Sequence, residues 1–356
     1  MYRPAKAFIS LPALRHNLQT VKKMAPDSKV LAVLKANGYG HGIARVAHQF
    51  NCADGFGVAC IEEAIILRQK GFLHRILLLE GLFSEAEIPL VYQHRLDLVI
   101  HSSHQLDWLL ASHYDGKIHV WVKVDTGMHR LGFNPGEVDS VIAKLERSPK
   151  PFQIHLISHL ASADESESFT LQQIACFDEF SRPYAYPRSL SNSAGLQRFK
   201  QAQYEWVRPG IMLYGAGHPF LEEYDLKPVM RLVSEITSLK KISKGESVGY
   251  GNTWQAPRDT YVGVVAIGYG DGYPRHAPSG TPVLIKGQRV PIIGRVSMDM
   301  VCVDLTEMAG QVRIGEEAVL WGDEALSVDE IADCAGTIGY ELLCGVTQRV
   351  PFIEVQ

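Results

Sequence analysis

The chain has 356 residues, 46% of them hydrophobic and 21% charged, and its formal net charge is −4. This composition is typical of a globular protein, and no Lys/Arg-rich run favours a nucleic-acid partner. No apolar stretch approaches the ~18 residues of a membrane-spanning helix, and the N-terminus lacks the apolar core of a signal peptide. The six cysteines form no C-x-x-C pair, so we expect reduced thiols in a cytoplasmic protein.

Short apolar segments alternate with amphipathic ones through the first two-thirds of the chain. Runs that are apolar throughout predict strands buried on both faces, and helical spacing predicts helices between them. The expected strands are residues 30–34, 56–60, 75–80, 96–101, 117–124, 153–158, 188–191 and 204–208. The expected helices are residues 11–24, 43–50, 61–71, 85–94, 105–113, 137–147, 168–180 and 194–199.

This alternation argues for a parallel sheet covered on both faces. Eight strand–helix units within about 220 residues match the size of a (β/α)8 barrel of the TIM type. A doubly wound open sheet is the alternative. No G-x-G-x-x-G and no P-loop signature follows any expected strand, so neither nucleotide-binding motif supports that alternative.

The texture changes after about Leu226, where β-rich runs are broken by glycine and proline. The expected strands lie within residues 233–242, 260–269, 281–305 and 317–322, and only residues 327–336 have helical spacing. We therefore predict two domains, a barrel over residues 1–227 and a mostly antiparallel β domain over residues 228–356.

The barrel predicts that chemistry lies just past the carboxyl ends of the strands, with any phosphate held after strands seven and eight. Polar residues and a possible phosphate turn occur at those points, namely Lys35, Lys123, Asp125, Arg130, His159, Asn192, Ser193, Arg208, Gly210 and Ile211. A lysine opposite a phosphate cradle suggests a Schiff base with pyridoxal phosphate (PLP), because a partly buried amine is more nucleophilic at neutral pH. His101 and His104 have no carboxylate or thiol nearby, so we expect no metal site.

The segment LKANGYGHG, which contains Lys35, resembles the PLP-lysine motif of the bacterial alanine racemases. The resemblance extends over nearly the whole chain, through KVDTGMHRLGF, SHLASADE, SNSAG, WVRPGIMLYG, SVGYG, IGYGDGYPR, GRVSMDM and GTIGYELLC. It implies a PLP barrel of fold type III followed by a β domain. It also implies a homodimeric isomerase with shared active sites, which interconverts L-alanine and D-alanine in peptidoglycan metabolism.

The resemblance assigns two proton-transferring bases, because inversion of a stereocentre needs a proton removed from one face and another delivered to the opposite face. Lys35 is implied as the Schiff-base lysine and one base, and Tyr250 as the other, reaching the cofactor from the second subunit. His159 and the cations around it are expected to make Tyr250 a better base. Arg208 resembles the partner of the pyridine nitrogen.

The remaining assignments concern cofactor and substrate contacts. Arg130 resembles the residue that contacts the cofactor's phenolic oxygen and the substrate carboxylate, and Lys123 matches a lysine that many family members carry as a carbamate. Implied cofactor-binding residues are Lys35, Tyr39, Asn192, Ser193, Arg208, Gly210, Ile211 and Tyr340. Implied substrate-lining residues are Tyr269, Met298 and Asp299, again from the second subunit. The family often has glycine where this chain has His129.

Two other PLP-barrel functions stay open at this point. A fold-type-III decarboxylase of a basic amino acid would carry a glycine-rich phosphate loop and a cysteine-containing C-terminal motif, which we do not find. A non-catalytic PLP-homeostasis protein would consist of a single barrel and would lack Tyr250. The β-rich region from about residue 228 onward argues against that second function.

Overall fold

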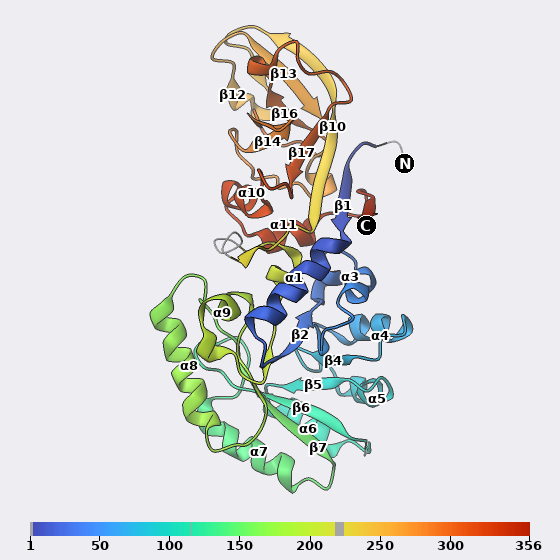
Figure 1. Cartoon of the computed structure of the whole chain (residues 1–356), viewed down its shortest axis with the longest axis vertical. Helices are drawn as coiled ribbons and strands as arrows, with labels where there is room; N and C mark the ends of the chain where they lie inside the picture. Colours follow the sequence, from blue (N-terminus) through green and yellow to red (C-terminus); the bar gives the residue numbers. More distant parts are fainter. Residues whose placement is uncertain (1–2, 115, 218–223) are drawn as a thin grey trace. The chain divides into compact units, whose positions relative to one another are not determined.

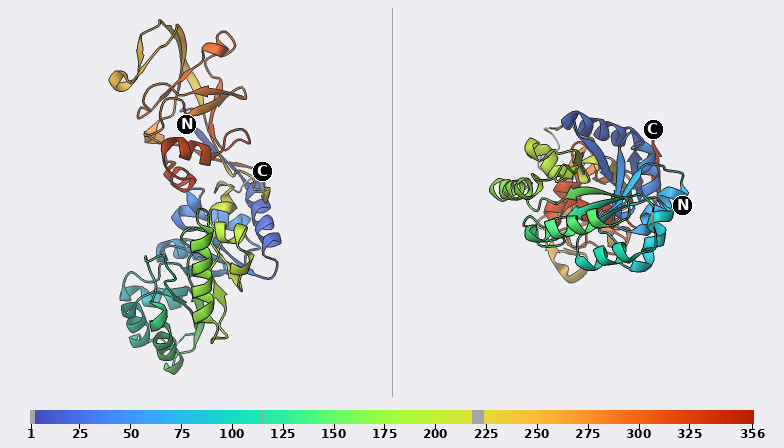
Figure 2. Two further views of the ribbon diagram at one scale, coloured as in Figure 1. Left: turned by 90° about the vertical axis from the view of Figure 1, so that its left-hand side faces the viewer. Right: turned by 90° about the horizontal axis from the view of Figure 1, so that it is seen from below.

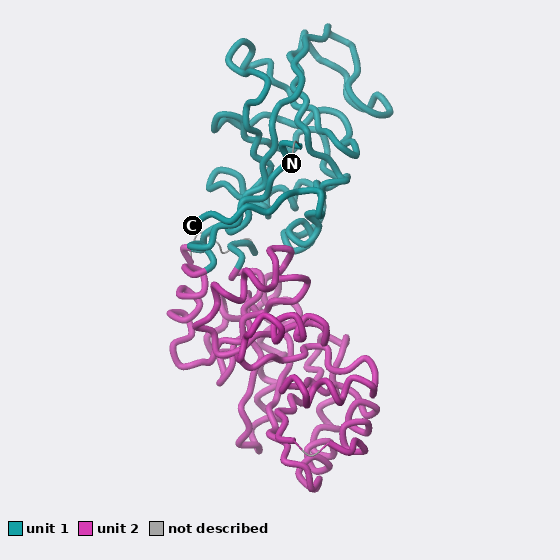
Figure 3. Tube along the Cα trace, turned by 90° about the vertical axis from the view of Figure 1, so that its right-hand side faces the viewer, with its two compact units in different colours: residues 1–14, 214–221, 226–356 teal, residues 15–213, 222–225 magenta. Residues whose placement is uncertain are grey.

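The computed structural model describes residues 3–114, 116–217 and 224–356, and the chain divides into two compact units (Figures 1 and 3). The barrel unit consists of Arg15–Leu213 and Glu222–Asp225. The β unit consists of Met1–Leu14, Tyr214–Leu221 and Leu226–Gln356.

The barrel unit contains a closed barrel of parallel strands, in which each strand pairs with the next along the chain and the last returns to the first. Its strands are β2 (Lys29–Val33), β3 (Gly55–Val58), β4 (Arg75–Leu78), β5 (Asp97–Ile100), β6 (Ile118–Lys123), β7 (Phe152–Ile157), β8 (Arg188–Ser189) and β9 (Trp206–Val207). Closure excludes the open doubly wound sheet, and the predicted barrel is confirmed.

Helices form the outer layer around these strands (Figures 1 and 2). They are α1 (Leu11–Met24), α3 (Ile43–Gln49), α4 (Ile61–Gln69), α5 (Ile88–Gln93), α6 (Ser103–Ala111), α7 (Val138–Arg147), α8 (Glu167–Ser181) and α9 (Ser193–Arg198). The short segment α2 (Lys35–Tyr39) directly follows β2 and has non-helical backbone angles inside it. In α7 the buried residues are Val138, Val141, Ile142 and Leu145, a spacing that puts one apolar stripe against the barrel. α8 begins where the Ser166 side chain accepts from the N–H of Phe169.

The barrel interior carries a polar layer near the amino ends of its strands. Arg75 Nη1 lies 2.6 Å from Asp97 Oδ2, which also accepts from Trp121 Nε1 at 3.1 Å. His119 Nδ1 lies 3.0 Å from His155 Nε2, and the His155 ring stacks on Trp121 with a centroid separation of 4.3 Å. Burial and the neighbouring Arg75 lower the pKa of His119 to about 4 and that of His155 to about 3. Both rings are therefore neutral at pH 7.

We predict that His155 makes the barrel unit sensitive to acid. In the unfolded chain a histidine has a pKa of about 6.5, so below that pH His155 is protonated in the unfolded state and stays neutral in the folded state until the pH nears 3. Stability is therefore present above about pH 6.5 and is lost as the pH falls toward the folded pKa. Between pH 7.5 and 5, we expect His155→Phe to gain about 1–2 kcal/mol of unfolding free energy relative to the parent protein.

Urea denaturation followed by tryptophan fluorescence at each pH measures this difference. The phenyl ring keeps the stack on Trp121, and Asp97 and Arg75 remain in both proteins, so their own titration largely cancels. The exposed His113, replaced by Phe, is the matched control. Identical pH profiles for His155→Phe and the parent protein would contradict the prediction.

The β unit is built on one eight-stranded sheet with the path β15–β14–β17–β10–β1–β18, to which β13 and β16 attach through β10. Its strands are β1 (Lys6–Ser10), β10 (Met230–Ile242), β13 (Thr260–Val265), β14 (Pro282–Ile285), β15 (Gln288–Pro291), β16 (Val301–Asp304), β17 (Glu317–Trp321) and β18 (Phe352–Val355). A separate hairpin pairs β11 (Ser247–Val248) with β12 (Trp254–Gln255). Among the strand pairs that the structure describes in this unit, only β1 and β18 are parallel, so the predicted, mostly antiparallel β architecture is confirmed.

Two elements of the β unit differ from the sequence-based expectation. The strand β1 comes from the start of the chain and pairs with β10 and β18. The expectation of a single helix is wrong, because α11 (Gly339–Gly345) follows α10 (Val328–Ala335). α11 is short and has glycine at both ends, which weakens the helical signal, and burial of Leu342 and Leu343 stabilises it instead. No helix in the described part of the chain is long and apolar enough to cross a membrane.

Candidate active site

Lys35 lies at the start of a left-handed turn. β2 ends at Val33, and Ala36, Asn37, Gly38 and Tyr39 then have φ angles of 53°, 55°, 66° and 50°. Left-handed backbone costs roughly 1–2 kcal/mol for each residue with a Cβ atom, and only one of these four is glycine. Other interactions must therefore hold the turn.

His41 supplies much of that support. Its ring is fully buried, and its Nδ1 lies 2.8 Å from the carbonyl oxygen of Tyr39 and 3.1 Å from that of Gly38. Burial lowers the pKa of His41 to about 4, so the ring is neutral and its proton is on Nδ1, where it can be donated. Asn37 adds a second brace, because its Oδ1 accepts from the N–H of Ile43 at 2.9 Å.

The turn carries Tyr39 over the end of β9, the strand that pairs with β2 where the barrel closes. A Cβ atom added at Gly210 would lie 2.4 Å from Tyr39 Oη, so the hydroxyl rests directly on the glycine backbone. Ser193 Oγ accepts from the N–H of Gly210 at 2.9 Å and from that of Met212 at 3.4 Å. Two hydroxyls and a run of backbone N–H groups that includes Ile211 thus meet after strands β8 and β9, where an anion is readily held.

Asn192 fixes the position of Ser193. Its Oδ1 accepts from the N–H of Gly195 at 2.9 Å and so caps α9, while its Nδ2 donates to the Leu160 carbonyl oxygen at 3.2 Å. The side chain therefore ties α9 to the segment after β7 and sets Ser193 as the first helical residue.

Arg208 is a buried cation, with 4% of its surface exposed. Its guanidinium donates to Ser189 Oγ at 2.6 Å, to the carbonyl oxygens of Ser158 and Leu190, and to His159 Nδ1 at 3.3 Å. Among the residues that the structure describes, no carboxylate pairs with it. Burial lowers the pKa of Arg208, yet a guanidinium keeps its proton at neutral pH.

The barrel mouth gathers positive charge around His159. Burial, followed by the charges of Arg208, Lys123, Arg130 and Lys35 in that order, holds the pKa of His159 well below its usual range. The half-buried imidazole is therefore neutral, and because Nδ1 accepts from Arg208, its proton is on Nε2.

Lys123 shows the same environment. Burial first, then Arg208 and Arg130, lower its pKa to about 8, against a weaker opposing effect of Glu80. Within the described ranges, the side chains of Lys35, Lys123 and Arg130 form no hydrogen bond or ion pair with the protein, although the Lys123 carbonyl oxygen accepts from the N–H of Phe133 at 2.9 Å. A cluster of cations without carboxylate partners is stabilised by a bound anion, so the mouth fits a ligand with a phosphate and further acidic oxygens.

The loop before Arg130 is organised by Asp125. Its carboxylate accepts from the N–H groups of Gly127 and His129, and Oδ2 lies 3.0 Å from His129 Nδ1. His129 has a φ angle of 54°, in the region that glycine adopts most easily. The contact with Asp125 supports this backbone conformation at a position where the family often has glycine.

The other predicted site residues belong to the β unit. Tyr250 lies in the short 3-10 helix η6 (Tyr250–Asn252), between β11 and β12, and is 68% exposed. Tyr340 lies in α11. Tyr269 and Met298 come from neighbouring loops, where the N–H of Tyr269 donates to the Ser297 carbonyl oxygen at 3.1 Å. The structure therefore brings Tyr269, Met298 and Asp299 together, and it places Tyr250 on a different segment.

Some residues with a part in the site were not singled out from sequence. His41 lies in the segment LKANGYGHG and Asp271 in IGYGDGYPR. The sequence motifs therefore contain both residues, but they do not show which groups these side chains contact. Arg3 and Arg349 carry no local signal, because each acts on a segment distant in the sequence.

Both parts of the chain match known protein families. The family model for the N-terminal domain of alanine racemase matches residues 9–218, and the model for its C-terminal domain matches residues 229–354. An alanine racemase of Vibrio cholerae serotype O1 is 49% identical over 356 residues, covering 98% of this chain and 97% of that protein. An alanine racemase of Coxiella burnetii is 46% identical over 364 residues, covering 99% of each.

Solved structures agree with these matches. The biosynthetic alanine racemase from Pseudomonas aeruginosa has a TM-score of 0.96 and 46% identity, over 99% of this chain and 100% of that one. The alanine racemase from Acinetobacter baumannii has a TM-score of 0.93 and 39% identity, with the same coverage of each chain.

A closed barrel with a lysine among cations at its mouth, joined in one chain to a β unit, defines a class of two-part barrel enzymes. Within that class, the chain belongs to the alanine racemase family. The predictions of the family, of its fold and of an isomerase are thereby confirmed.

We predict that Gly210→Ala disrupts the contact between the phosphate turn and Tyr39. The new methyl group would overlap Tyr39 Oη, and we expect a loss of about 1–3 kcal/mol of unfolding free energy. Adding Tyr39→Phe removes the overlapping oxygen and is expected to restore part of the stability.

Thermal unfolding of the single and double variants measures both changes in stability. Gly136→Ala is the matched control, because a Cβ atom there has no neighbour within 4 Å. A double variant no more stable than Gly210→Ala would show that the overlap with Tyr39 is not the cause.

Proposed function

We propose that this protein is a PLP-dependent alanine racemase that interconverts L-alanine and D-alanine and so supplies or consumes D-alanine for peptidoglycan metabolism. The observation that carries the proposal is the cationic barrel mouth around Lys35 and Arg208, in a chain that belongs to the alanine racemase family. We also propose a cytoplasmic location, which the six free cysteines favour.

The residues of the barrel mouth fit PLP. Tyr39, Ser193, Gly210 and Ile211, set in place by Asn192, are suited to the phosphate, and we assign Tyr340 of the β unit to it as well. Arg208 is suited to the ring nitrogen, and the unpaired amine of Lys35 to the carbonyl carbon. When bound, PLP supplies the electron sink that makes the α-hydrogen of an amino acid acidic.

Two bases of the protein then act on opposite faces of the substrate α-carbon. Lys35, which the left-handed turn holds in place, removes the α-proton from D-alanine or returns it on that same face. Tyr250 of the partner subunit takes or returns it on the L face, with the neutral His159 near its phenol. One rigid base cannot reach both faces, which is why the proposal needs two.

Arg208 controls the fate of the substrate by keeping its own proton. A guanidinium donates a hydrogen bond to the ring nitrogen without protonating it. The negative charge that develops on the substrate is then delocalised less, so reprotonation at the α-carbon is favoured over side reactions.

Arg130 binds the substrate carboxylate and the cofactor's phenolic oxygen in this proposal. Lys123, whose pKa is lowered to about 8 by burial and the neighbouring arginines, has an appreciable fraction of neutral amine at neutral pH. That is the form that reacts with carbon dioxide, and we propose that Lys123 is carbamylated. The carbamate would turn a cation that repels Arg130 into an anion that holds it.

The proposed assembly is a homodimer with shared active sites. Its basis is that Tyr250, Tyr269, Met298 and Asp299 lie in the β unit, whereas Lys35 lies in the barrel unit. We propose residues 1–227 as the PLP-binding domain and residues 228–356 as the domain that completes the partner's site.

Chiral chromatography of L-alanine incubated with the purified protein and PLP tests the activity. We expect progress to equal amounts of L-alanine and D-alanine, because mirror-image molecules have equal free energy. Lys35→Ala is expected to abolish both the conversion and the visible absorbance of the lysine-bound cofactor. A yellow protein that leaves L-alanine unchanged would overturn the proposed substrate while keeping the cofactor.

Tyr250→Phe tests the second base. Net racemisation must fall equally in both directions, since the equilibrium constant is one, so the informative measurement is exchange of the α-hydrogen with deuterated solvent by NMR. We expect exchange to persist for D-alanine, through Lys35, and to collapse for L-alanine. Equal, mild losses for both enantiomers would exclude Tyr250 as the L-face base.

A further inference from the structure

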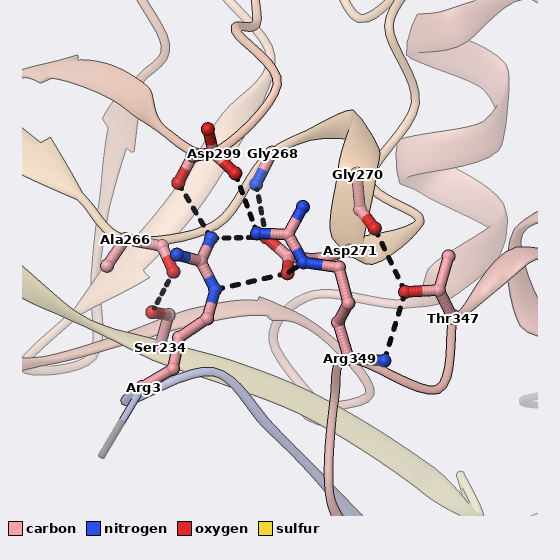
Figure 4. A network of polar contacts seen from close by, with 9 residues as sticks. All are labelled: Arg3, Ser234, Ala266, Gly268, Gly270, Asp271, Asp299, Thr347 and Arg349. Atoms are coloured by element: carbon pink, nitrogen blue, oxygen red, sulfur yellow. Dashed lines mark hydrogen bonds and ion pairs between the residues drawn. The ribbon is translucent and has the colours of Figure 1, made fainter. Parts of the chain in front are cut away.

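Asp271 is a fully buried carboxylate in the β unit, at the end of the 3-10 helix η7 (Tyr269–Asp271). Its Oδ2 accepts from Arg3 Nη2 at 2.6 Å and from the N–H of Gly268 at 3.0 Å, and its Oδ1 accepts from Arg3 Nε at 3.1 Å. Arg349 Nε lies 3.4 Å from Oδ1 on the other side. Figure 4 shows the carboxylate between the two guanidinium groups.

Both arginines also bind Asp299. Arg3 Nη2 donates to the Asp299 carbonyl oxygen at 2.9 Å, and Arg349 Nη2 donates to its carboxylate at 2.6 Å (Figure 4). Thr347 adds a backbone link, because its N–H donates to the Asp271 carbonyl oxygen at 3.0 Å. The network therefore connects four segments that are far apart in the sequence.

The two loops that carry Tyr269 and Met298 are locked together at this network. The N–H of Gly270 donates to the Met298 carbonyl oxygen at 2.8 Å. A Cβ atom at Gly268 would lie 2.2 Å from the Ser297 carbonyl oxygen, and one at Gly270 would lie 2.2 Å from Arg349 Nη1. The backbones approach so closely that neither loop can shift without the other.

The side chains of Tyr269 and Met298 on these loops are exposed, in contrast to the Asp271 carboxylate. Tyr269 is 39% exposed and Met298 is 52% exposed, whereas the Asp271 side chain is fully buried. A charged group without exposure is costly to leave unpaired. The position of Asp271 is therefore fixed by its arginines, and the loops follow it.

We propose that Asp271, with Arg3 and Arg349, is a positioning residue that sets how Tyr269, Met298 and Asp299 are presented to the substrate. This inference rests on the proposed function, which gives those three residues their substrate-lining role. Asp271, Arg3 and Arg349 act through the loops, and their side chains are not assigned to substrate contact. Arg3 extends the site to the first residues of the chain.

Arg3→Ala is the test, because it removes three hydrogen bonds from the network and leaves Asp271 paired with Arg349. We expect KM for alanine to rise roughly threefold to tenfold while kcat changes by less than about twofold, the pattern of lost substrate positioning. The visible absorbance of bound PLP should be unchanged. Arg3→Lys keeps the charge but loses the bidentate contact with Asp271, so its KM should lie between those of the parent protein and Arg3→Ala.

Hydrogen–deuterium exchange gives a readout that does not require activity. In Arg3→Ala, the amides of residues 268–271 and 297–300 should exchange faster, with those of β13 and β16 unchanged. Arg289→Ala is the matched control, since Arg289 pairs with Glu330 at a distant place in the same unit. It should alter neither these amides nor KM.

Three outcomes would overturn the inference: unchanged exchange in Arg3→Ala, faster exchange with an unchanged KM, or equal effects in Arg289→Ala. A parent protein that does not racemise alanine would refute the proposed function, and the substrate role of the network would fall with it. The exchange experiment would in that case still decide whether Asp271 positions the two loops.

Discussion

The left-handed turn from Ala36 to Tyr39 is the constraint on which the barrel mouth depends. It costs several kcal/mol of backbone strain, by the roughly 1–2 kcal/mol expected for each residue with a Cβ atom, and burial of the neutral His41 beneath it offsets that cost. This backbone conformation places Lys35 just after the end of β2 and, four residues later, brings the Tyr39 hydroxyl against Gly210. Right-handed backbone over these residues would direct the side chain of Lys35 or that of Tyr39 elsewhere. The strained backbone is therefore what places both side chains at the barrel mouth.

Charge is arranged differently in the two units. In the β unit, Arg3 and Arg349 are matched with Asp271 and Asp299, and the result is a rigid scaffold. At the barrel mouth, the charged groups that shift the pKa of Lys123 among the described residues are three cations and a single carboxylate, Glu80. Matched charge holds loops in place, whereas unmatched charge is available to a ligand. This contrast separates the positioning machinery from the binding machinery within one chain.

The sequence predicted those features that depend on residues close together in the chain. Each of the eight barrel strands overlaps a strand expected from the sequence, although β8 and β9 are only two residues long. The residues at the strand ends were found because a barrel brings every such end to one rim. The support of Asp271 by Arg3 was not predictable, since it joins residues 268 positions apart. Likewise, α11 depends on burial of Leu342 and Leu343 rather than on its own propensity.

The strand β1 lies between β10 and β18 in the main sheet of the β unit, with Ala7 opposite Phe352. A strand that precedes the barrel in the sequence is therefore flanked by one that follows it. Throughout synthesis of the barrel, β1 has neither partner, and an unpaired strand edge is a template for aggregation. Completion of this sheet requires segments on both sides of the barrel in the sequence, so a chain released before residue 352 would keep one side of β1 uncovered.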